Sequence, residues 1–227
     1  MSDTPLRLAV FDVDGTLVDS QNNICAAMTT AFLGEGLEPR DKATVHRIIG
    51  LSLVEAIERL LPESEKGLAP RLAERYKQAY QDIMAQPDYE DPLYPGAAEA
   101  LDRLEAQGIL LGLATSKSRR GVERFLSIHG YESRFVTVRS ADDGPGKPHP
   151  FMIEQALKES GAEARYTAMI GDTSFDMEMG CNAGAISVGV AWGYHEPAVL
   201  AASGARLVAT NFNDLVCNLT TLLGEDE

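Results

Sequence analysis

The spacing of hydrophobic residues changes near residue 89, and the two patterns predict two kinds of structure. From residue 21 to about residue 86, apolar residues recur every three or four positions, as Ile24, Met28 and Phe32 do. That spacing places them on one face of a helix. Nothing in this stretch alternates apolar and polar residues with period two, so we expect several helices and no strand.

Short apolar runs separated by turns and helical patterns make up the rest of the chain. Strands alternating with helices are typical of a parallel sheet with helices on both faces. We therefore predict an α/β fold, a Rossmann-like parallel sheet core with an inserted all-helical domain. The predicted strands cover residues 6–11, 109–114, 135–138, 167–170, 185–191 and 206–209.

Three prolines and a glycine between residues 87 and 96 mark the change of pattern, and such residues are typical of a linker or hinge. We expect one α/β domain, formed by residues 1–17 and 89–227, and a helical insert formed by residues 18–88. An insert after the first strand leaves the sheet at the carboxyl end of that strand. Open α/β sheets bind their ligands at this edge.

Four polar clusters follow predicted strands. Because the carboxyl ends of parallel strands lie at one edge of a sheet, we expect the clusters to converge, although they are far apart in the sequence. The clusters are Phe11–Thr16, Thr115–Lys117, Gly146–Pro148 and Gly171–Asp176.

The residue types in these clusters suit phosphoryl transfer. Carboxylate oxygens are the hard ligands that Mg²⁺ prefers, and a carboxylate can attack phosphorus to form an aspartyl-phosphate. A second carboxylate two residues further on can protonate the leaving oxygen and later activate water. A lysine and a hydroxyl can hold the transferring oxygens as charge develops. The sequence therefore predicts a magnesium-dependent site.

The formal net charge of −14 argues against two classes of partner. It repels nucleic acid and anionic membranes, so we expect neither to bind. It also repels phosphate esters, so the site needs a local cationic centre, which Mg²⁺ and Lys147 would supply.

The cysteines and the apolar runs bear on where the protein works. Three scattered cysteines outside any C-x-x-C pair favour neither a disulfide framework nor a zinc site and fit a reducing cytosol. Met1–Pro5 lacks the basic start of a signal peptide. No apolar run approaches the roughly 18 to 20 residues that cross a bilayer. We expect a cytoplasmic protein.

Together, the four clusters resemble the motifs of the haloacid-dehalogenase-like phosphohydrolase superfamily, in the expected order. The helical insert lies where that family carries a small helical cap, and the surrounding sequence looks most like phosphoglycolate-phosphatase-type members. The residues that carry the resemblance are Asp12, Asp14, Thr115, Lys147, Asp172 and Asp176.

The resemblance implies a role for each residue. Asp12 would be the nucleophile and a metal ligand. Asp14 would be the acid/base group and would ligate the metal through its backbone carbonyl, while Lys147 would bridge the nucleophile and the phosphate. Thr115 and Ser116 would bind the phosphate. Asp172 would be a further metal ligand, and Asp176 would ligate the metal directly or through water.

Some residues keep plainer interpretations. Thr115 and Ser116 could cap the helix that starts near Ser118, and Lys117 is interpreted as a solvated lysine at that helix start. In the insert, Arg47 is the best candidate to bind a carboxylate or second phosphate of the substrate. A solvated helix arginine fits Arg47 equally well.

Asp14 also favours one reaction within the superfamily. Its dehalogenases and phosphonate-cleaving members lack an acid there, so we predict a hydrolase of phosphate monoesters of small metabolites, similar to phosphoglycolate phosphatase. A sugar-phosphate mutase or pyrophosphatase of the same superfamily stays open. From other classes, a phospho-receiver domain would be much shorter and lack the insert. A catalytically silent binding protein would not need the complete reactive set.

Overall fold

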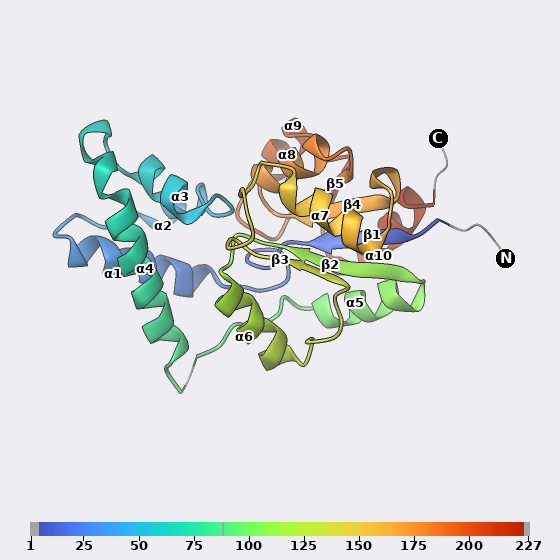
Figure 1. Cartoon of the computed structure of the whole chain (residues 1–227), viewed down its shortest axis with the longest axis horizontal. Coiled ribbons are helices and arrows are strands. Elements are labelled where there is room, and N and C mark those ends of the chain that lie inside the picture. Colours follow the sequence, from blue (N-terminus) through green and yellow to red (C-terminus); the bar gives the residue numbers. More distant parts are fainter. Residues whose placement is uncertain (1–4, 88, 225–227) are drawn as a thin grey trace.

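A six-stranded parallel sheet forms the larger part of the molecule, and a lobe of helices lies beside it (Figure 1). The computed structural model describes residues 5–87 and 89–224. The strand order is β3-β2-β1-β4-β5-β6, and all neighbours run parallel, which confirms the predicted α/β fold. The strands are β1 (Arg7–Phe11), β2 (Ile109–Ala114), β3 (Thr137–Arg139), β4 (Thr167–Gly171), β5 (Ile186–Val190) and β6 (Leu207–Ala209).

Both faces of the sheet are buried. In β1, Leu8 and Val10 belong to one hydrophobic cluster, whereas Ala9 and Phe11 belong to the cluster on the opposite face. A strand covered on both faces reads as an unbroken apolar run, which is why the runs were recognisable in the sequence. The covering helices are α7 (Phe151–Ser160) and α8 (Ser174–Asn182) on the Leu8 face, and α5 (Ala97–Ala106), α6 (Arg119–His129) and α10 (Phe212–Leu222) on the Phe11 face.

Apart from strand bounds that shift by one residue, the sheet domain departs from the expectation in three places. β3 begins at Thr137 rather than at residue 135, since ladder pairing with β2 starts only where Thr137 faces Gly112. After β5 comes a short helix, α9 (Pro197–Ala202), which was not predicted. It buries only Leu200, too little to produce a helical apolar pattern. A 3₁₀ turn, η2 (Ala164–Tyr166), precedes β4.

The insert is all-helical, as predicted, with no strand in the described residues 21–87. A separate hydrophobic cluster holds its helices together and includes Ile24, Phe32, Ile57 and Leu72. Its elements are α1 (Gln21–Gly34), α2 (Lys42–His46), α3 (Leu53–Leu60), η1 (Glu63–Leu68) and α4 (Ala69–Met84).

The chain crosses between the two parts at two adjacent segments. The backbone N–H of Asp19 donates to the carbonyl of Pro92 at 3.0 Å, and that of Tyr94 donates to the carbonyl of Leu17 at 2.9 Å. Both crossings thus lie together, just beyond β1. The domain boundaries expected at residues 17/18 and 88/89 stay a prediction. Of the residues in those predicted domains, 1–4, 88 and 225–227 lie outside the described part of the chain.

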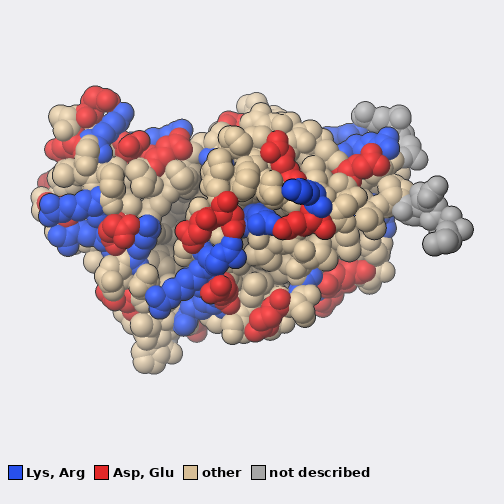
Figure 2. All heavy atoms as spheres, in the orientation of Figure 1, with Lys and Arg blue, Asp and Glu red and all other residues tan. Residues whose placement is uncertain are grey.

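Acidic and basic side chains are interspersed over the face shown in Figure 2, despite the net charge of −14. None of the helices in the described part of the chain is long and apolar enough to span a membrane.

Candidate active site

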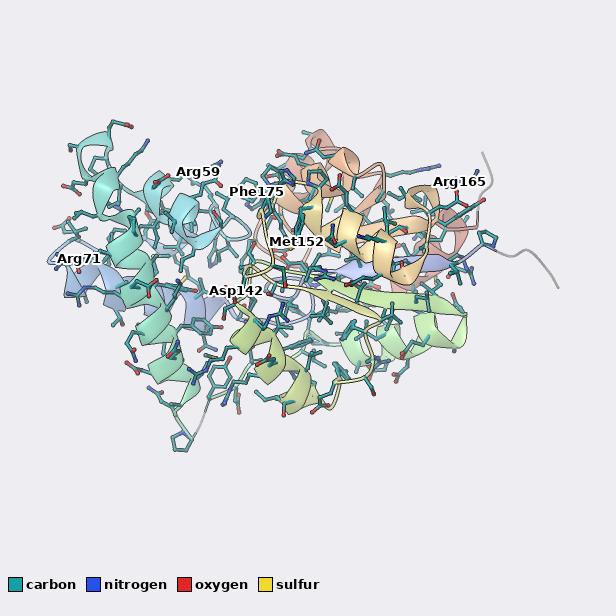
Figure 3. All side chains as sticks on the ribbon, in the orientation of Figure 1. Arg59, Arg71, Asp142, Met152, Arg165 and Phe175 are labelled. Atoms are coloured by element: carbon teal, nitrogen blue, oxygen red, sulfur yellow. The ribbon has the colours of Figure 1, made fainter. Side chains whose placement is uncertain are left out.

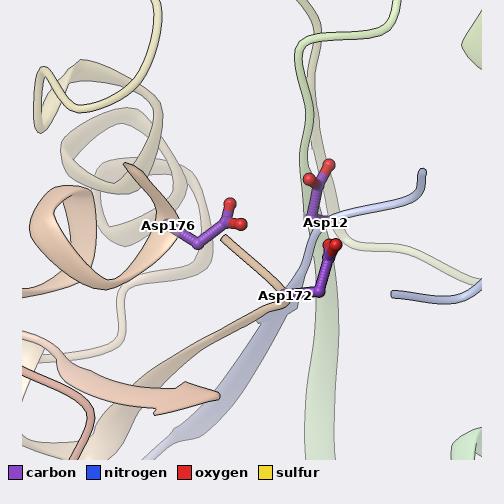
Figure 4. A group of neighbouring side chains, drawn as sticks. All are labelled: Asp12, Asp172 and Asp176. Carbon is purple, nitrogen blue, oxygen red and sulfur yellow. The ribbon is translucent and has the colours of Figure 1, made fainter. Parts of the chain in front are cut away.

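Three buried carboxylates meet at the carboxyl edge of the sheet (Figure 4). Asp12 directly follows β1, and Asp172 directly follows the neighbouring strand β4. Asp176 lies in the first turn of α8. Each offers one oxygen, and these oxygens all lie within 4.8 Å of one another. The structure therefore brings together the three carboxylates that the sequence analysis assigned to the metal.

Asp176 is fixed by the start of its own helix. Its Oδ2 accepts hydrogen bonds from the backbone N–H and the hydroxyl of Thr173, at 3.0 and 2.7 Å. Thr173 is the N-cap of α8, and its side chain accepts in turn from the N–H of Asp176, so the two residues form a capping box. A Cβ on Gly171 would lie 2.2 Å from the Asp176 carboxyl carbon, so only glycine fits there.

Asp172 is held by two donors. Its Oδ1 accepts from the hydroxyl of Thr16, and its Oδ2 from the N–H of Tyr194, both at 2.9 Å. Gly15, with φ of +82°, comes so close that a Cβ would lie 2.3 Å from this carboxylate. Two features therefore require glycine at position 15: the left-handed backbone and the close approach of Asp172.

Lys147 lies against this cluster and is almost fully buried. Its ammonium nitrogen is 2.7 Å from Oδ2 of Asp12 and 2.6 Å from Oδ1 of Asp176. Burial alone would lower the pKa of Lys147, but the two carboxylates outweigh that effect and raise it. The side chain is therefore a permanent cation within the cluster.

The carboxylates outnumber this cation. Three carboxylates against one ammonium leave two negative charges uncompensated, the charge of one divalent cation. Burial raises the pKa of Asp12 to about 6, even though Lys147 opposes the shift. Burial also raises the pKa of Asp172 well above its usual range, helped by the charges of Asp176 and Asp12. An all-oxygen donor set with excess negative charge fits a hard divalent metal ion.

Asp14 is half-buried, and its Oδ1 accepts from the ammonium group of Lys117 at 2.8 Å. The same ammonium nitrogen lies 3.7 Å from Asp91 and 3.4 Å from the hydroxyl of Tyr80. The interpretation of Lys117 as a solvated lysine is wrong, because only 8% of the residue is exposed. Its stem runs inward past Gly121, where a Cβ would lie 2.7 Å from the Lys117 Cγ.

Sequence reasoning missed two participants, Lys117 and Asp91. The glycine four residues after Lys117, one helical turn away, was a weak signal that its side chain lies along the helix. Asp91 lies in the proline-rich linker and is 5% exposed. Nothing in its sequence context indicated burial.

Thr115 and Ser116 follow β2 and face the same site. Thr115 is fully buried, and its hydroxyl accepts from the N–H of Lys117 at 3.2 Å. The Ser116 hydroxyl donates to the carbonyl of Gly50, in the insert, at 2.6 Å. Neither residue caps α6, because the N-cap is Ser118, which accepts from the N–H of Gly121.

A pocket of about 350 Å³ lies between the insert and the sheet domain. Asp12, Asp14, Thr115, Ser116 and Lys117 line its sheet-domain side. Outside the pocket, the two parts also touch where the Arg59 guanidinium of α3 lies over the Phe175 ring of α8, 5.4 Å from its centroid (Figure 3). The insert therefore covers the carboxylate cluster, as a cap does.

Arg47 is not brought to the other residues. It is the C-cap of α2, its side chain is exposed, and it does not line the pocket. The residues just beyond it, 48–51, do line the pocket.

Comparison with known proteins agrees with this geometry. The family model for haloacid dehalogenase-like hydrolases matches residues 9–190. A protein of Dickeya dadantii named "Probable phosphatase IndB" is 34% identical over 210 residues, which cover 92% of this chain and 91% of the relative. A phosphoglycolate phosphatase of Vibrio parahaemolyticus is 28% identical over 221 residues, covering 95% and 97%.

A solved structure has a similar overall fold. The crystal structure of a hydrolase from Pseudomonas syringae superimposes with a TM-score of 0.81 and is 29% identical, covering 95% of this chain and 98% of the other. The Dickeya and Vibrio relatives both carry the name of a phosphatase, in agreement with the predicted enzyme class. With its motifs gathered at one sheet edge beneath a helical insert, the chain belongs to the haloacid dehalogenase-like hydrolase family.

Proposed function

We propose that the protein is a magnesium-dependent hydrolase that cleaves phosphate monoesters of small metabolites through an aspartyl-phosphate on Asp12. The observation that carries this proposal is the position of Asp12. Its carboxylate belongs to the three-carboxylate cluster, pairs with Lys147 at 2.7 Å and lines the pocket. One group can therefore meet the metal, the cation and the substrate.

The chain's own residues divide the work. The Asp12 carboxylate attacks phosphorus and forms an acyl phosphate, while Asp14 gives a proton to the leaving alcohol oxygen. Asp14 then takes a proton from the water that attacks the aspartyl-phosphate, and inorganic phosphate leaves. Lys147 and the hydroxyl of Thr115 neutralise and orient the phosphoryl oxygens during both steps.

Asp12, Asp172, Asp176 and the backbone carbonyl of Asp14 would hold Mg²⁺. The ion would supply positive charge next to the transferring phosphoryl group and offset the repulsion between that group and the carboxylates. We prefer Mg²⁺ because the donors are oxygens only, the ligand type that Mg²⁺ favours.

A small substrate tests the proposal without depending on the specificity of the pocket. Acetyl phosphate should be hydrolysed with Mg²⁺, activity should vanish in EDTA and return when Mg²⁺ is restored, and Ca²⁺ should inhibit because it accepts more ligands at longer distances. The Asp12→Asn variant should be inactive. Full activity in EDTA would remove the metal from the proposal, and an active Asp12→Asn enzyme would remove the nucleophile.

A further inference from the structure

The pocket above the nucleophile changes character with distance from it. At the sheet domain its lining is polar, with Asp12, Asp14 and Thr115. On the side of the insert its lining is mostly apolar, apart from Lys77 and Gln81, and two aromatic rings, those of Tyr76 and Tyr80, lie 5.8 Å apart there. The apolar side, which we call the cap wall, consists of Ile24, Met28, Ile48, Ile49, Leu51, Leu53, Ala56, Tyr76, Tyr80 and Met84.

The described cations that line this pocket are not placed to bind a second anionic group. The Lys117 ammonium is already paired with Asp14 and lies close to Asp91. Lys77 pairs with Glu74 at 2.7 Å, and its side chain is 52% exposed. Arg120 is exposed, so water screens its charge. A carboxylate pushed against the cap wall would lose its hydration and gain no buried cationic partner.

We infer that the alcohol part of the physiological substrate is apolar and ring-bearing, so that the enzyme acts on phosphate monoesters of aromatic or similarly apolar alcohols. This inference rests on the proposed phosphatase function. The phosphoryl group lies at Asp12, and the alcohol extends away from the carboxylates toward the cap wall. There its ring replaces water against Tyr76, Met28 and Leu53, which favours binding in proportion to the apolar area buried.

Three substrates test the inference on the magnesium-loaded enzyme. Benzyl phosphate carries a ring, phosphoglycolate carries a carboxylate, and acetyl phosphate carries neither. The kcat/KM for benzyl phosphate should exceed that for phosphoglycolate by about tenfold or more, as expected for burying one ring. Equal values, or a preference for phosphoglycolate, would overturn the inference. Failure to hydrolyse any of the three, acetyl phosphate included, would instead overturn the proposed function.

A matched pair of variants locates the effect. Leu53 lines the pocket at the start of α3, whereas its neighbour Val54 is 40% exposed and does not line it. Leu53→Lys places a cation on the cap wall. It should lower the ratio of kcat/KM for benzyl phosphate to that for phosphoglycolate by about tenfold. Val54→Lys should leave the ratio unchanged.

Acetyl phosphate activity separates specificity from folding. If Leu53→Lys loses that activity too, the same ratio is measured with Met84→Lys, which adds a cation from the last residue of α4. The benzyl phosphate to phosphoglycolate ratio of kcat/KM could stay at the wild-type value in a folded variant with a lysine in the pocket lining. That result would show that the alcohol does not contact the cap wall.

Discussion

The ammonium nitrogen of Lys117 lies 2.8 Å from Oδ1 of Asp14, and both side chains are largely buried. Burial alone would lower the pKa of Lys117, but Asp14, Tyr80 and Asp91 outweigh that effect and raise it, so the lysine stays charged. The proposed acid/base group is therefore oriented by a cation that also contacts the linker, through Asp91, and the insert, through Tyr80.

This relationship predicts the effect of Lys117→Met. Without the ammonium group Asp14 loses its fixed position, so kcat for an alkyl phosphate should fall by about 10². The kcat for p-nitrophenyl phosphate, whose leaving group needs no proton, should fall much less. Lys77→Met, on the exposed rim of the pocket, serves as the control. Equal losses on both substrates would contradict a role that acts through Asp14.

Removing Lys117 also leaves Asp91 buried without its cation, which costs about 3–5 kcal/mol for a buried pair. The double variant Lys117→Met/Asp91→Asn should therefore melt at a higher temperature than Lys117→Met alone. It should not recover activity on the alkyl phosphate, since Asp14 is still without its partner. If the double variant recovered both the melting temperature and the activity on the alkyl phosphate, stability alone would explain the activity lost in Lys117→Met.

Arg47→Ala should change KM by less than about twofold for phosphoglycolate, because an exposed side chain outside the pocket gives little binding energy. Steady-state kinetics with phosphoglycolate and acetyl phosphate measure this. A KM that rises tenfold for phosphoglycolate alone would return Arg47 to the binding site.

The sheet and its reactive edge were predictable because the signals are local. β2 lies where its apolar run placed it, Ile109–Ala114, and the polar residues that end each run converge because parallel strands share a carboxyl edge. Asp12 and Asp172 are adjacent in space because β1 and β4 are neighbours. The order of the strands, in contrast, depends on how the crossover helices pack, and the apolar runs themselves do not specify it.

Contacts between the insert and the sheet domain were not predictable from local pattern. Lys117 contacts Tyr80 and Asp91 only when the insert lies over the sheet. Its neighbours in sequence are polar, so the local pattern suggested an exposed lysine. Arg47 is the reverse case. The ability of arginine to bind a carboxylate or phosphate suggested the pocket, yet the residues just beyond Arg47 line the pocket and the arginine does not. Which residues of such a loop face the pocket depends on long-range packing.

The stabilising effect of Mg²⁺ should depend on pH. Burial raises the pKa of Asp12 from 3.8 to about 6 in the metal-free protein. A raised carboxyl pKa contributes stability that is fully present below pH 3.8 and is lost as pH rises through about 6. Bound Mg²⁺ favours the ionised carboxylate, so it should recover the stability that is lost at higher pH.

Thermal melts with and without Mg²⁺ measure this, at about pH 5 and about pH 8. The rise in Tm caused by Mg²⁺ should be larger at the higher pH. In Asp12→Asn, the difference between the two pH values should shrink, because the titrating carboxyl is gone. The same Mg²⁺-induced rise at both pH values in the wild type would contradict a metal site that includes Asp12.

Substitutions of the two aspartates at the end of β1, Asp12 and Asp14, should impair different steps of the reaction. Asp12→Asn removes the nucleophile, so no substrate should be cleaved and no phosphoenzyme should form. Asp14→Asn keeps the nucleophile and removes the proton donor and the later base. An alkyl phosphate should then be almost inert, because its leaving alkoxide is strongly basic and needs a proton.

p-Nitrophenyl phosphate separates the steps in Asp14→Asn, since nitrophenolate leaves without a proton. The variant should still phosphorylate Asp12 and then stall, because the attacking water has no base. Rapid mixing should show a nitrophenolate burst of about one equivalent per active site, followed by slow turnover, as an accumulating covalent intermediate requires. The protein should carry phosphate that hydroxylamine releases, and the same experiment on Asp12→Asn should show neither burst nor label. With saturating Mg²⁺ and intact substrate binding, a missing burst in Asp14→Asn would mean that Asp14 is needed before the phosphoenzyme forms, against the division of roles proposed for this pair.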